Sequence, residues 1–183
     1  GYTVSDCTAE SIKAIIMVRN SEAFKDVHDE ITPERLQKGI DVLLSLQNTG
    51  SFEYGSFATY EKIKAPLFME KLNPAEVFGN IMVEYPYVEC TDSSVLGLTF
   101  FHKHSDYRKE DISKSIAIAI QSLKNYQADD GSWYGCWGIC FTYAGMFAIE
   151  ALHSVGETYF NSEYVKKGCD FLASKQMEDG GWG

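Results

Sequence analysis

The amino-acid sequence predicts an all-α protein whose helices pair into repeated units and curve into an α/α toroid. Three segments that end in Gln are apolar on one helical face, and each continues into a glycine-containing turn and an aromatic residue. A second series of predicted helices alternates with these three segments along the chain. A helix-and-turn unit that recurs along a chain is typical of arrays in which neighbouring units stack on one another.

The first predicted helix covers residues 6–20, with isoleucines along one side. Pro33 suits the first turn of the next helix, which ends at Gln47. Residues 55–87 contain three prolines and several aromatics, so we expect a long irregular connection with at most a short hairpin at 55–60. Further helices are predicted at 90–104, before Gln127, at 139–155 and before Gln176.

The three Gln segments share their apolar positions. Four, seven and eight residues before each Gln stand apolar or small residues: Leu43, Leu123 and Leu172; Ile40, Ile120 and Cys169; Gly39, Ala119 and Gly168. These positions lie on one helical face. After each Gln come a glycine (Gly50, Gly131, Gly180) and an aromatic (Phe52, Trp133, Trp182). We expect each Gln to hydrogen-bond near the end of an adjacent helix, and the aromatics to pack and tie the outer helices together.

The alternating helices begin with similar sequences. SDCTAES at 5–11 and VECTDSS at 88–94 start 83 positions apart, and Gln47 and Gln127 lie 80 apart, so the two series advance almost in step. Inner helices of such a ring all begin at the same end. Asp6 with Cys7, and Glu89 with Cys90, are therefore expected to converge on a central cavity.

Composition and charge exclude several classes of protein. The chain has 183 residues, of which 45% are hydrophobic and 14% aromatic, which excludes a disordered chain. A net charge of −10 argues against a nucleic-acid partner. Residues 131–149 carry no charge, but the glycines in their first half favour a turn and a buried helix over a membrane span. The chain opens at Gly1 without a leader and stops at Gly183, so we expect one domain truncated at both ends.

The five cysteines are spaced irregularly, which fits reduced thiols of an intracellular protein. Cys136 and Cys140 have the spacing of half a metal site, but no His is near them in sequence, so we expect no metal. We interpret His28, His102, His104 and His153 as surface or packing residues. Taken alone, Asp6 is interpreted as a helix N-cap, since Asp is among the residues preferred there.

Several motifs carry a family resemblance that covers the whole chain. QADDGSW and QMEDGGW resemble the QW repeat of triterpene cyclases, and VSDCTAE resembles the catalytic-acid motif of eukaryotic oxidosqualene cyclases. GSFATYE, NPAEVFGN, YPYVECT and GSWYGCWGICFTYAG resemble the same family in its order. QNTGSF departs from the repeat, because Phe52 replaces Trp and the motif is one residue shorter.

The resemblance implies that residues 1–183 are part of an α6-α6 barrel domain of a terpene cyclase, most like the fungal members that form lanosterol. Its implied activity is cyclisation of (S)-2,3-oxidosqualene to lanosterol in sterol biosynthesis, by an acid-initiated carbocation cascade that needs no cofactor and no metal. It also implies a membrane-associated enzyme on the cytosolic side of the endoplasmic reticulum or on lipid droplets, held by segments outside this chain.

The resemblance also assigns roles to residues. Asp6 is the general acid, and the thiols of Cys7 and Cys90 hydrogen-bond it. To be protonated at neutral pH, such an acid needs about 4 kcal/mol of differential stabilisation, which an apolar cavity supplies by desolvation. Tyr60 lies by the late cation with a His from upstream. The remaining implied site residues are Val4, Trp137 and Tyr143, which contact substrate, and Glu76. The resemblance implies that Glu76 contacts the residues that line the cavity and does not itself contact substrate.

Alternatives remain at this stage. A cycloartenol-forming or other triterpene cyclase is one, although Val4 favours lanosterol because cycloartenol-forming relatives tend to carry Ile there. A bacterial squalene cyclase typically has a further Asp where Cys7 stands. A prenyltransferase subunit calls for a zinc site that is not visible in the sequence. A non-catalytic helical-repeat scaffold fits the repeats, but it does not need an acid at its concave centre.

Overall fold

The computed structural model describes residues 2–26, 30–50, 54–62, 65–75 and 82–182. Within these ranges the chain forms six α-helices and two short 3₁₀ helices, and no β-strand. The α-helices are α1 (Ser5–Arg19), α2 (Pro33–Leu46), α3 (Val88–His104), α4 (Lys109–Tyr126), α5 (Cys140–Ser154) and α6 (Glu163–Ser174), and the 3₁₀ helices are η1 (Glu22–Phe24) and η2 (Leu67–Leu72). The predicted all-α class is confirmed.

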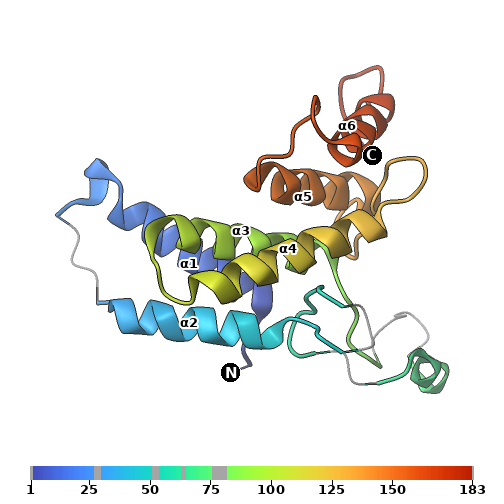
Figure 1. The fold of residues 1–183 in the computed structure, drawn as a ribbon. Helices are drawn as coiled ribbons and strands as arrows, with labels where there is room; N and C mark the ends of the chain where they lie inside the picture. The colour runs from blue at the N-terminus through green and yellow to red at the C-terminus, as the bar shows by residue number, and fades with distance from the viewer. Residues whose placement is uncertain (1, 27–29, 51–53, 63–64, 76–81, 183) are drawn as a thin grey trace.

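The helices form two alternating series. α3 packs against both α1 and α5, and these three helices make the inner series. Each of α2, α4 and α6 packs against the inner helix that precedes it in the chain. Figure 1 shows the pairs following one another from α2 to α6 as an open curved row. The predicted alternation of inner and outer helices is confirmed, and the row has the curvature of a helical toroid.

Local sequence explains where the outer helices begin. Thr32 caps α2, because its hydroxyl oxygen accepts a hydrogen bond from the backbone N–H of Arg35, and Pro33 occupies the first turn. Leu36, Ile40 and Leu43 then lie on one face of α2 and are buried. Ser162 caps α6 in the same way, with its hydroxyl oxygen accepting from the backbone N–H of Val165.

Small residues allow the inner helices to approach closely. A Cβ atom added to Gly97 on α3 would lie 2.8 Å from the Cβ of Ala9 on α1. Among the described residues, α1 and α3 make a more extensive contact with each other than any other two helices do. The close approach brings the side chains of the two helices into one core.

The QW turns join neighbouring outer helices. The Gln127 side-chain amide donates to the Gly131 carbonyl in its own turn (3.0 Å) and to the Tyr164 carbonyl in the first turn of α6 (2.9 Å). The indole N–H of Trp133 donates to the Leu123 carbonyl at 2.8 Å, and its buried ring lies against Gly168. The turn thus fixes the end of α4 to α6.

The other two turns repeat parts of this arrangement. Gln47 donates to the Gly55 carbonyl (3.0 Å) and to the Ser115 carbonyl on α4 (2.9 Å). Trp182 donates to the Leu172 carbonyl at 2.8 Å. Gln176 donates to the Gly180 carbonyl (2.9 Å), and within the described residues no bond to another helix is recorded for it. Phe52 lies outside the described residues.

The connection between α2 and α3 is irregular, as predicted. It contains η2 and, in its described parts, no β-ladder at the position of the hairpin that the sequence allows. Instead, Asn48 and the following turn pair locally: the Asn48 N–H donates to the Ser56 carbonyl (2.9 Å) and the Gly55 N–H donates to the Asn48 carbonyl (2.7 Å).

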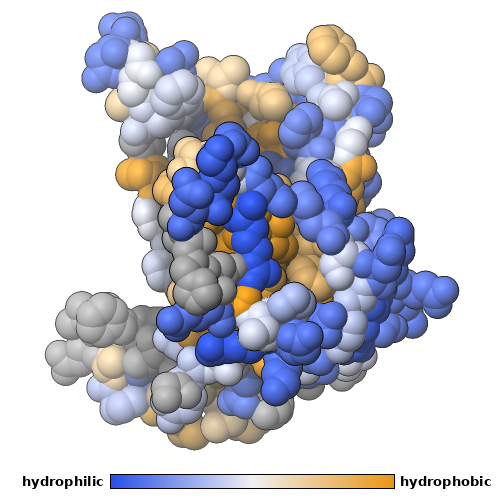
Figure 2. Space-filling model, turned by 90° about the vertical axis from the view of Figure 1, so that its left-hand side faces the viewer, coloured by the Kyte–Doolittle hydropathy of each residue, from blue (hydrophilic) through white to orange (hydrophobic). Residues whose placement is uncertain are grey.

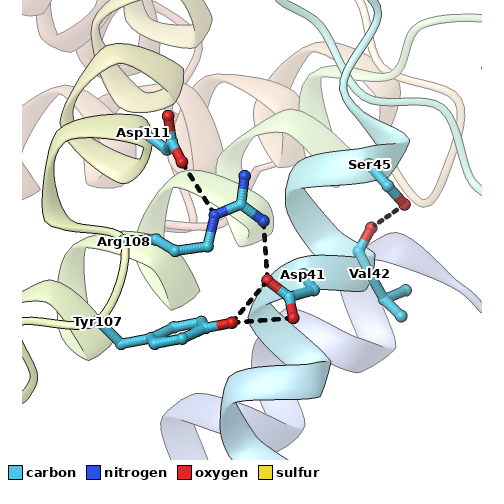
Figure 3. A network of polar contacts seen from close by, with 6 residues as sticks. All are labelled: Asp41, Val42, Ser45, Tyr107, Arg108 and Asp111. Atoms are coloured by element: carbon cyan, nitrogen blue, oxygen red, sulfur yellow. Dashed lines mark hydrogen bonds and ion pairs between the residues drawn. The ribbon is translucent and has the colours of Figure 1, made fainter.

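A polar network links the outer helix α2 to the start of the next outer helix, α4 (Figure 3). The Asp41 carboxylate accepts from the Arg108 guanidinium (2.7 Å) and from the Tyr107 hydroxyl (3.0 and 3.1 Å), and Arg108 also contacts Asp111 at 2.9 Å. Arg108 has a left-handed backbone, with φ of 49°. Its guanidinium group bridges Asp41 on α2 and Asp111 on α4.

The surface at the end where α1 and α3 finish is mostly polar. Figure 2 views this side, where hydrophilic side chains cover most of the surface and apolar side chains show between them. A pocket of about 260 Å³ lies there between the ends of α1 and α3 and the start of α2. None of the helices in the described ranges combines the length and the apolar character that a membrane crossing requires.

Candidate active site

The starts of α1 and α3 lie together, held by the segment 56–60. The Ser5 N–H donates to the Thr59 carbonyl (2.9 Å), and the buried Ser5 hydroxyl donates to the Ala58 carbonyl (2.7 Å). On the α3 side, the Phe57 N–H donates to the Thr91 hydroxyl oxygen (3.0 Å). One segment therefore binds both helix starts, so α1 and α3 begin at the same end of the molecule.

Asp6 is the second residue of α1, and its side chain is partly buried. Its Oδ1 atom accepts a hydrogen bond from the Cys7 backbone N–H at 2.8 Å. The N-cap of α1 is Val4, which has no capping side chain, so interpreting Asp6 as the N-cap is wrong. The carboxyl group lies within the first turn instead.

The two thiols that interact with Asp6 differ in exposure. Cys7 is exposed, and the charge of Asp6, with a smaller contribution from burial and from a hydrogen bond to Asp6, raises the pKa of its thiol. Cys90 is fully buried on α3. Burial, followed by the charge of Asp6, raises the pKa of the Cys90 thiol to about 12. Both thiols therefore stay protonated at neutral pH and have an S–H group to donate.

A hydroxyl group of the segment that joins the helix starts lies beside the Cys90 sulfur. The Cys90 Sγ atom lies 3.7 Å from the Thr59 Oγ1 atom, and Asp6 acts on Cys90 through its charge. Hydrogen bonding of Asp6 by Cys90 stays a prediction. Thr59 was not singled out by the sequence analysis, because a threonine in an irregular connection carries no signal of its own.

Asp6 opens onto a cleft along the inner helices. The cleft has a volume of about 350 Å³ and is lined by residues of all three inner helices, namely Asp6, Cys7, Glu10, Lys13, Ser93, Leu96, Phe147 and Glu150. Tyr143, one turn before Phe147 on α5, packs edge-on against the Phe147 ring, with ring centroids 4.8 Å apart. Tyr143 contacts Phe147 but is not itself among the residues that line the cleft.

A buried carboxyl group lies between the inner helices next to this cleft. Asp92 on α3 is fully buried, and within the described residues neither of its oxygens has a hydrogen-bond partner. Burial raises its pKa well above the usual value, and the charge of Glu150 on α5 adds to that effect. No motif in the sequence distinguishes Asp92. Its burial depends on how α3 packs between α1 and α5, which no pattern in the sequence specified.

Trp137 lies in the loop before α5, facing the start of α3. Its ring packs against Tyr87, the N-cap of α3, with centroids 4.7 Å apart, and it is 45% exposed. The backbone N–H groups of Cys136 and Trp137 donate to the Glu89 Oε1 atom at 2.8 and 3.2 Å. Part of the Trp137 side chain is thus open to solvent, and stabilisation of a cation by an indole requires access to its π-face.

Tyr60 lies at the outer edge of the same end. Its ring meets Tyr2 edge-on at 6.4 Å, and both residues line a recess of about 510 Å³ with Glu61 and Glu84. The Glu84 Oε2 atom accepts from the Thr59 N–H at 3.3 Å, and desolvation raises the pKa of its carboxyl group. Glu84 is a further titratable group near Tyr60 that the sequence analysis did not predict.

Other residues named from the sequence lie apart from these contacts. Val4 lines a separate surface depression beside Cys7. Glu76 and His28 lie outside the described residues. His104 and His153 contact backbone carbonyls of their own helix regions, Phe100 and Glu157. In the part of the chain that the structure describes, no three His, Cys, Asp or Glu side chains are grouped so that they could hold a metal ion.

Comparison with known proteins identifies the family. The profile of the squalene-hopene cyclase C-terminal domain matches residues 4–183. The chain is 78% identical over 183 residues to the lanosterol synthase of Saccharomyces cerevisiae, 68% identical over 184 residues to that of Candida albicans, and 42% identical over 187 residues to that of Homo sapiens. All of this chain aligns with each of them, and it spans about a quarter of their length (25% in each case). The chain therefore belongs to the squalene-hopene cyclase C-terminal domain family.

Proposed function

We propose that this chain forms the acid-bearing part of the active site in an oxidosqualene cyclase that makes lanosterol. The observation that carries the proposal is the position of Asp6: its side chain opens onto the cleft along the inner helices, and it interacts electrostatically with the Cys7 and Cys90 thiols. Identity of 78% to a lanosterol synthase over the whole chain supports the same reaction.

In the proposed reaction, the carboxylic acid form of Asp6 donates its proton to the epoxide oxygen of 2,3-oxidosqualene. One C–O bond breaks with its electron pair going to oxygen, and the electron-poor carbon is attacked by the neighbouring double bond. Successive double bonds close the rings, hydride and methyl shifts follow, and loss of a proton from carbon ends the cascade. One proton enters and one leaves, so the product is an isomer of the substrate and the protein needs no oxidant or reductant.

The aromatic residues supply the second requirement of this chemistry. A carbocation needs electron density near it but no nucleophile that would capture it. The Trp137 side chain is partly exposed, and a desolvated cation–π contact is worth roughly 0.5–2 kcal/mol. In this proposal Trp137 and Tyr143 line the substrate, Val4 borders it, and Tyr60 acts near the final deprotonation, with Glu76 supporting the cavity.

A C30 epoxide substrate is a neutral lipid. We therefore include in the proposal a membrane-associated enzyme at the endoplasmic reticulum or lipid droplets, with membrane contact through segments other than those described. Cell fractionation with a fluorescently tagged full-length protein tests this part. Recovery with the soluble fraction under low-salt and high-salt conditions would contradict it, without bearing on the reaction.

The reaction is tested by incubating the purified full-length protein with 2,3-oxidosqualene and, separately, with squalene, and by identifying the products with gas chromatography and mass spectrometry. Lanosterol from oxidosqualene and no product from squalene is the expected result. Cycloartenol or another triterpene as the main product would overturn the lanosterol assignment. No conversion of either substrate would favour the non-catalytic scaffold.

A further inference from the structure

We propose that Glu89 is a positioning residue. It fixes the backbone around Trp137 to the start of α3 and so sets the position of the Trp137 ring relative to Asp6. The anchoring itself rests on geometry alone. Its consequence for catalysis rests on the proposed cyclase function.

The contacts of Glu89 are those of an anchor. Glu89 is the second residue of α3, and it is 5% exposed. Its Oε1 atom accepts from the backbone N–H groups of Cys136 and Trp137, which are 47 and 48 positions further along the chain. A buried carboxylate that accepts two backbone N–H groups forms charge-assisted bonds, which are stronger than those between neutral groups.

Gly135 shows how closely the loop is held against the carboxylate. A Cβ atom added to Gly135 would lie 2.4 Å from Glu89 Oε1 and 2.8 Å from the Cβ of Ala144 on α5. Any side chain at this position would displace Glu89 or α5. The loop backbone therefore lies directly between the carboxylate of α3 and the first turns of α5.

The same turn of α3 also holds the ring of Trp137. Tyr87, two residues before Glu89, packs against the indole at 4.7 Å, and its own N–H donates to the Phe57 carbonyl at 3.1 Å. Phe57 belongs to the segment whose Thr59 contacts Cys90. The turn 87–90 thus contacts both the ring and the backbone of Trp137, and it also carries the buried Cys90 thiol.

The second carboxylate oxygen suggests how to separate anchoring from charge. Within the described residues, Glu89 Oε2 is buried and has no hydrogen-bond partner. Glu89→Gln keeps one acceptor oxygen for the two N–H groups and exchanges the unpartnered oxygen for an amide group. Glu89→Asp keeps the charge but is one methylene too short to reach. If Glu89 acts by anchoring the loop, Glu89→Gln should keep the loop in place and Glu89→Asp should not.

The experiment uses the full-length enzyme with the variants Glu89→Ala, Glu89→Gln and Glu89→Asp. Asp41→Ala is the matched control, because Asp41 is a carboxylate that bridges α2 and α4 away from the cleft. Two quantities are measured on each: amide hydrogen exchange in peptides covering residues 134–139, and kcat with the distribution of cyclised products.

In Glu89→Ala and Glu89→Asp we expect faster exchange of the Cys136 and Trp137 amides. We also expect a fall in kcat of about tenfold to 100-fold, with incompletely cyclised products, since a displacement of about 1 Å in an active site has such an effect. Glu89→Gln and Asp41→Ala should stay within about threefold of the parent kcat, a difference of less than about 0.7 kcal/mol, and keep the parent product distribution.

Two results would overturn the inference: unchanged exchange at 134–139 in Glu89→Ala, or a Glu89→Gln enzyme as impaired as Glu89→Ala. If Glu89→Ala does not fold, the comparison of Glu89→Gln with Glu89→Asp decides the question in the same terms. If the parent enzyme does not convert oxidosqualene, the proposed function fails, while the exchange data still decide whether Glu89 anchors the loop.

Discussion

The side-chain amide of Gln47, at the end of α2, donates a hydrogen bond of 2.9 Å to the backbone carbonyl of Ser115 on α4. Gln127, at the end of α4, reaches Tyr164 on α6 at the same distance. The two amides thus join successive outer helices by one kind of contact. What differs is burial: Gln47 is 3% exposed, and Gln127 is only partly buried.

The first prediction follows from that difference. Gln47→Ala leaves a buried carbonyl of Gly55 without its partner as well as losing the bond to α4, so it should lower the free energy of unfolding by about 1–3 kcal/mol. Gln127→Ala, where water can replace the amide, should cost less. Thermal unfolding of the full-length variants measures both. Equal effects, or a larger effect for Gln127→Ala, would contradict the proposed role of burial.

A second prediction concerns Gly131. Its φ of 90° is unfavourable for other residues, and a Cβ atom there would lie 2.4 Å from the backbone carbonyl oxygen of Lys167 on α6. Gly131→Ala should therefore push α6 away from the turn and cost more than about 3 kcal/mol. Gly156→Ala is the control, because Gly156 has a φ of 92° and open space around it, so it should lose only about 1 kcal/mol. Similar melting temperatures for the two variants would show that the turn and α6 are not in close contact.

A third prediction is a pH dependence caused by Asp92. Because burial raises its pKa in the folded protein, the folded state keeps a proton that the unfolded state releases above about pH 4. Folding then loses about 1.4 kcal/mol per pH unit until the raised pKa is passed. Stability from this group is therefore full below about pH 4 and declines as the pH rises. The charged groups that face it are Glu10 and Lys13 on α1 and Glu150 on α5.

Asp92→Asn removes this titration and keeps the shape of the side chain. Its stability relative to the parent should increase as the pH rises above about 4, as measured by unfolding at a series of pH values. Asp106→Asn, at an exposed position, controls for the loss of a negative charge. A stability difference between Asp92→Asn and the parent that does not change with pH would show that Asp92 is ionised in the folded state.

The sequence predicted the helices well because their signals are local. Ile12 and Ile16 on α1, and Leu36, Ile40 and Leu43 on α2, repeat at helical spacing and are buried as a periodic face must be. It also predicted that Asp6 and Cys90 begin helices at the same end, because the two helix series advance in step.

The contacts that complete the site had no such signal. Glu89 meets Trp137 across 48 positions, and Thr59 reaches Cys90 from an irregular connection. Both depend on the path of a loop, which has no periodicity to read. The start of α1 one residue before Asp6 is also a tertiary effect, because the Thr59 carbonyl accepts the Ser5 N–H there.

A fourth prediction concerns the 183-residue chain on its own. Large apolar side chains on and next to α5 are exposed, among them Phe141, Tyr143 and Met146, and Phe160 is 94% exposed. Such a surface favours association. Expressed alone, the chain should aggregate or bind a hydrophobic dye such as ANS, and it should not convert oxidosqualene. Turnover by the isolated chain would contradict a pocket shared with other segments.

The most direct test of the account is Asp6→Asn in the full-length enzyme, compared with Cys7→Ala and Cys90→Ala. Asn keeps the size of the side chain and its hydrogen bond from the Cys7 N–H, but it has no proton to give. General acid catalysis contributes about 10²–10⁴-fold, so lanosterol formation should fall to background while the melting temperature stays near that of the parent. The two alanine variants should lose less, because each removes a neighbour of the acid and leaves the proton. Lanosterol formation near the parent rate in Asp6→Asn would contradict the assignment of Asp6 as the acid.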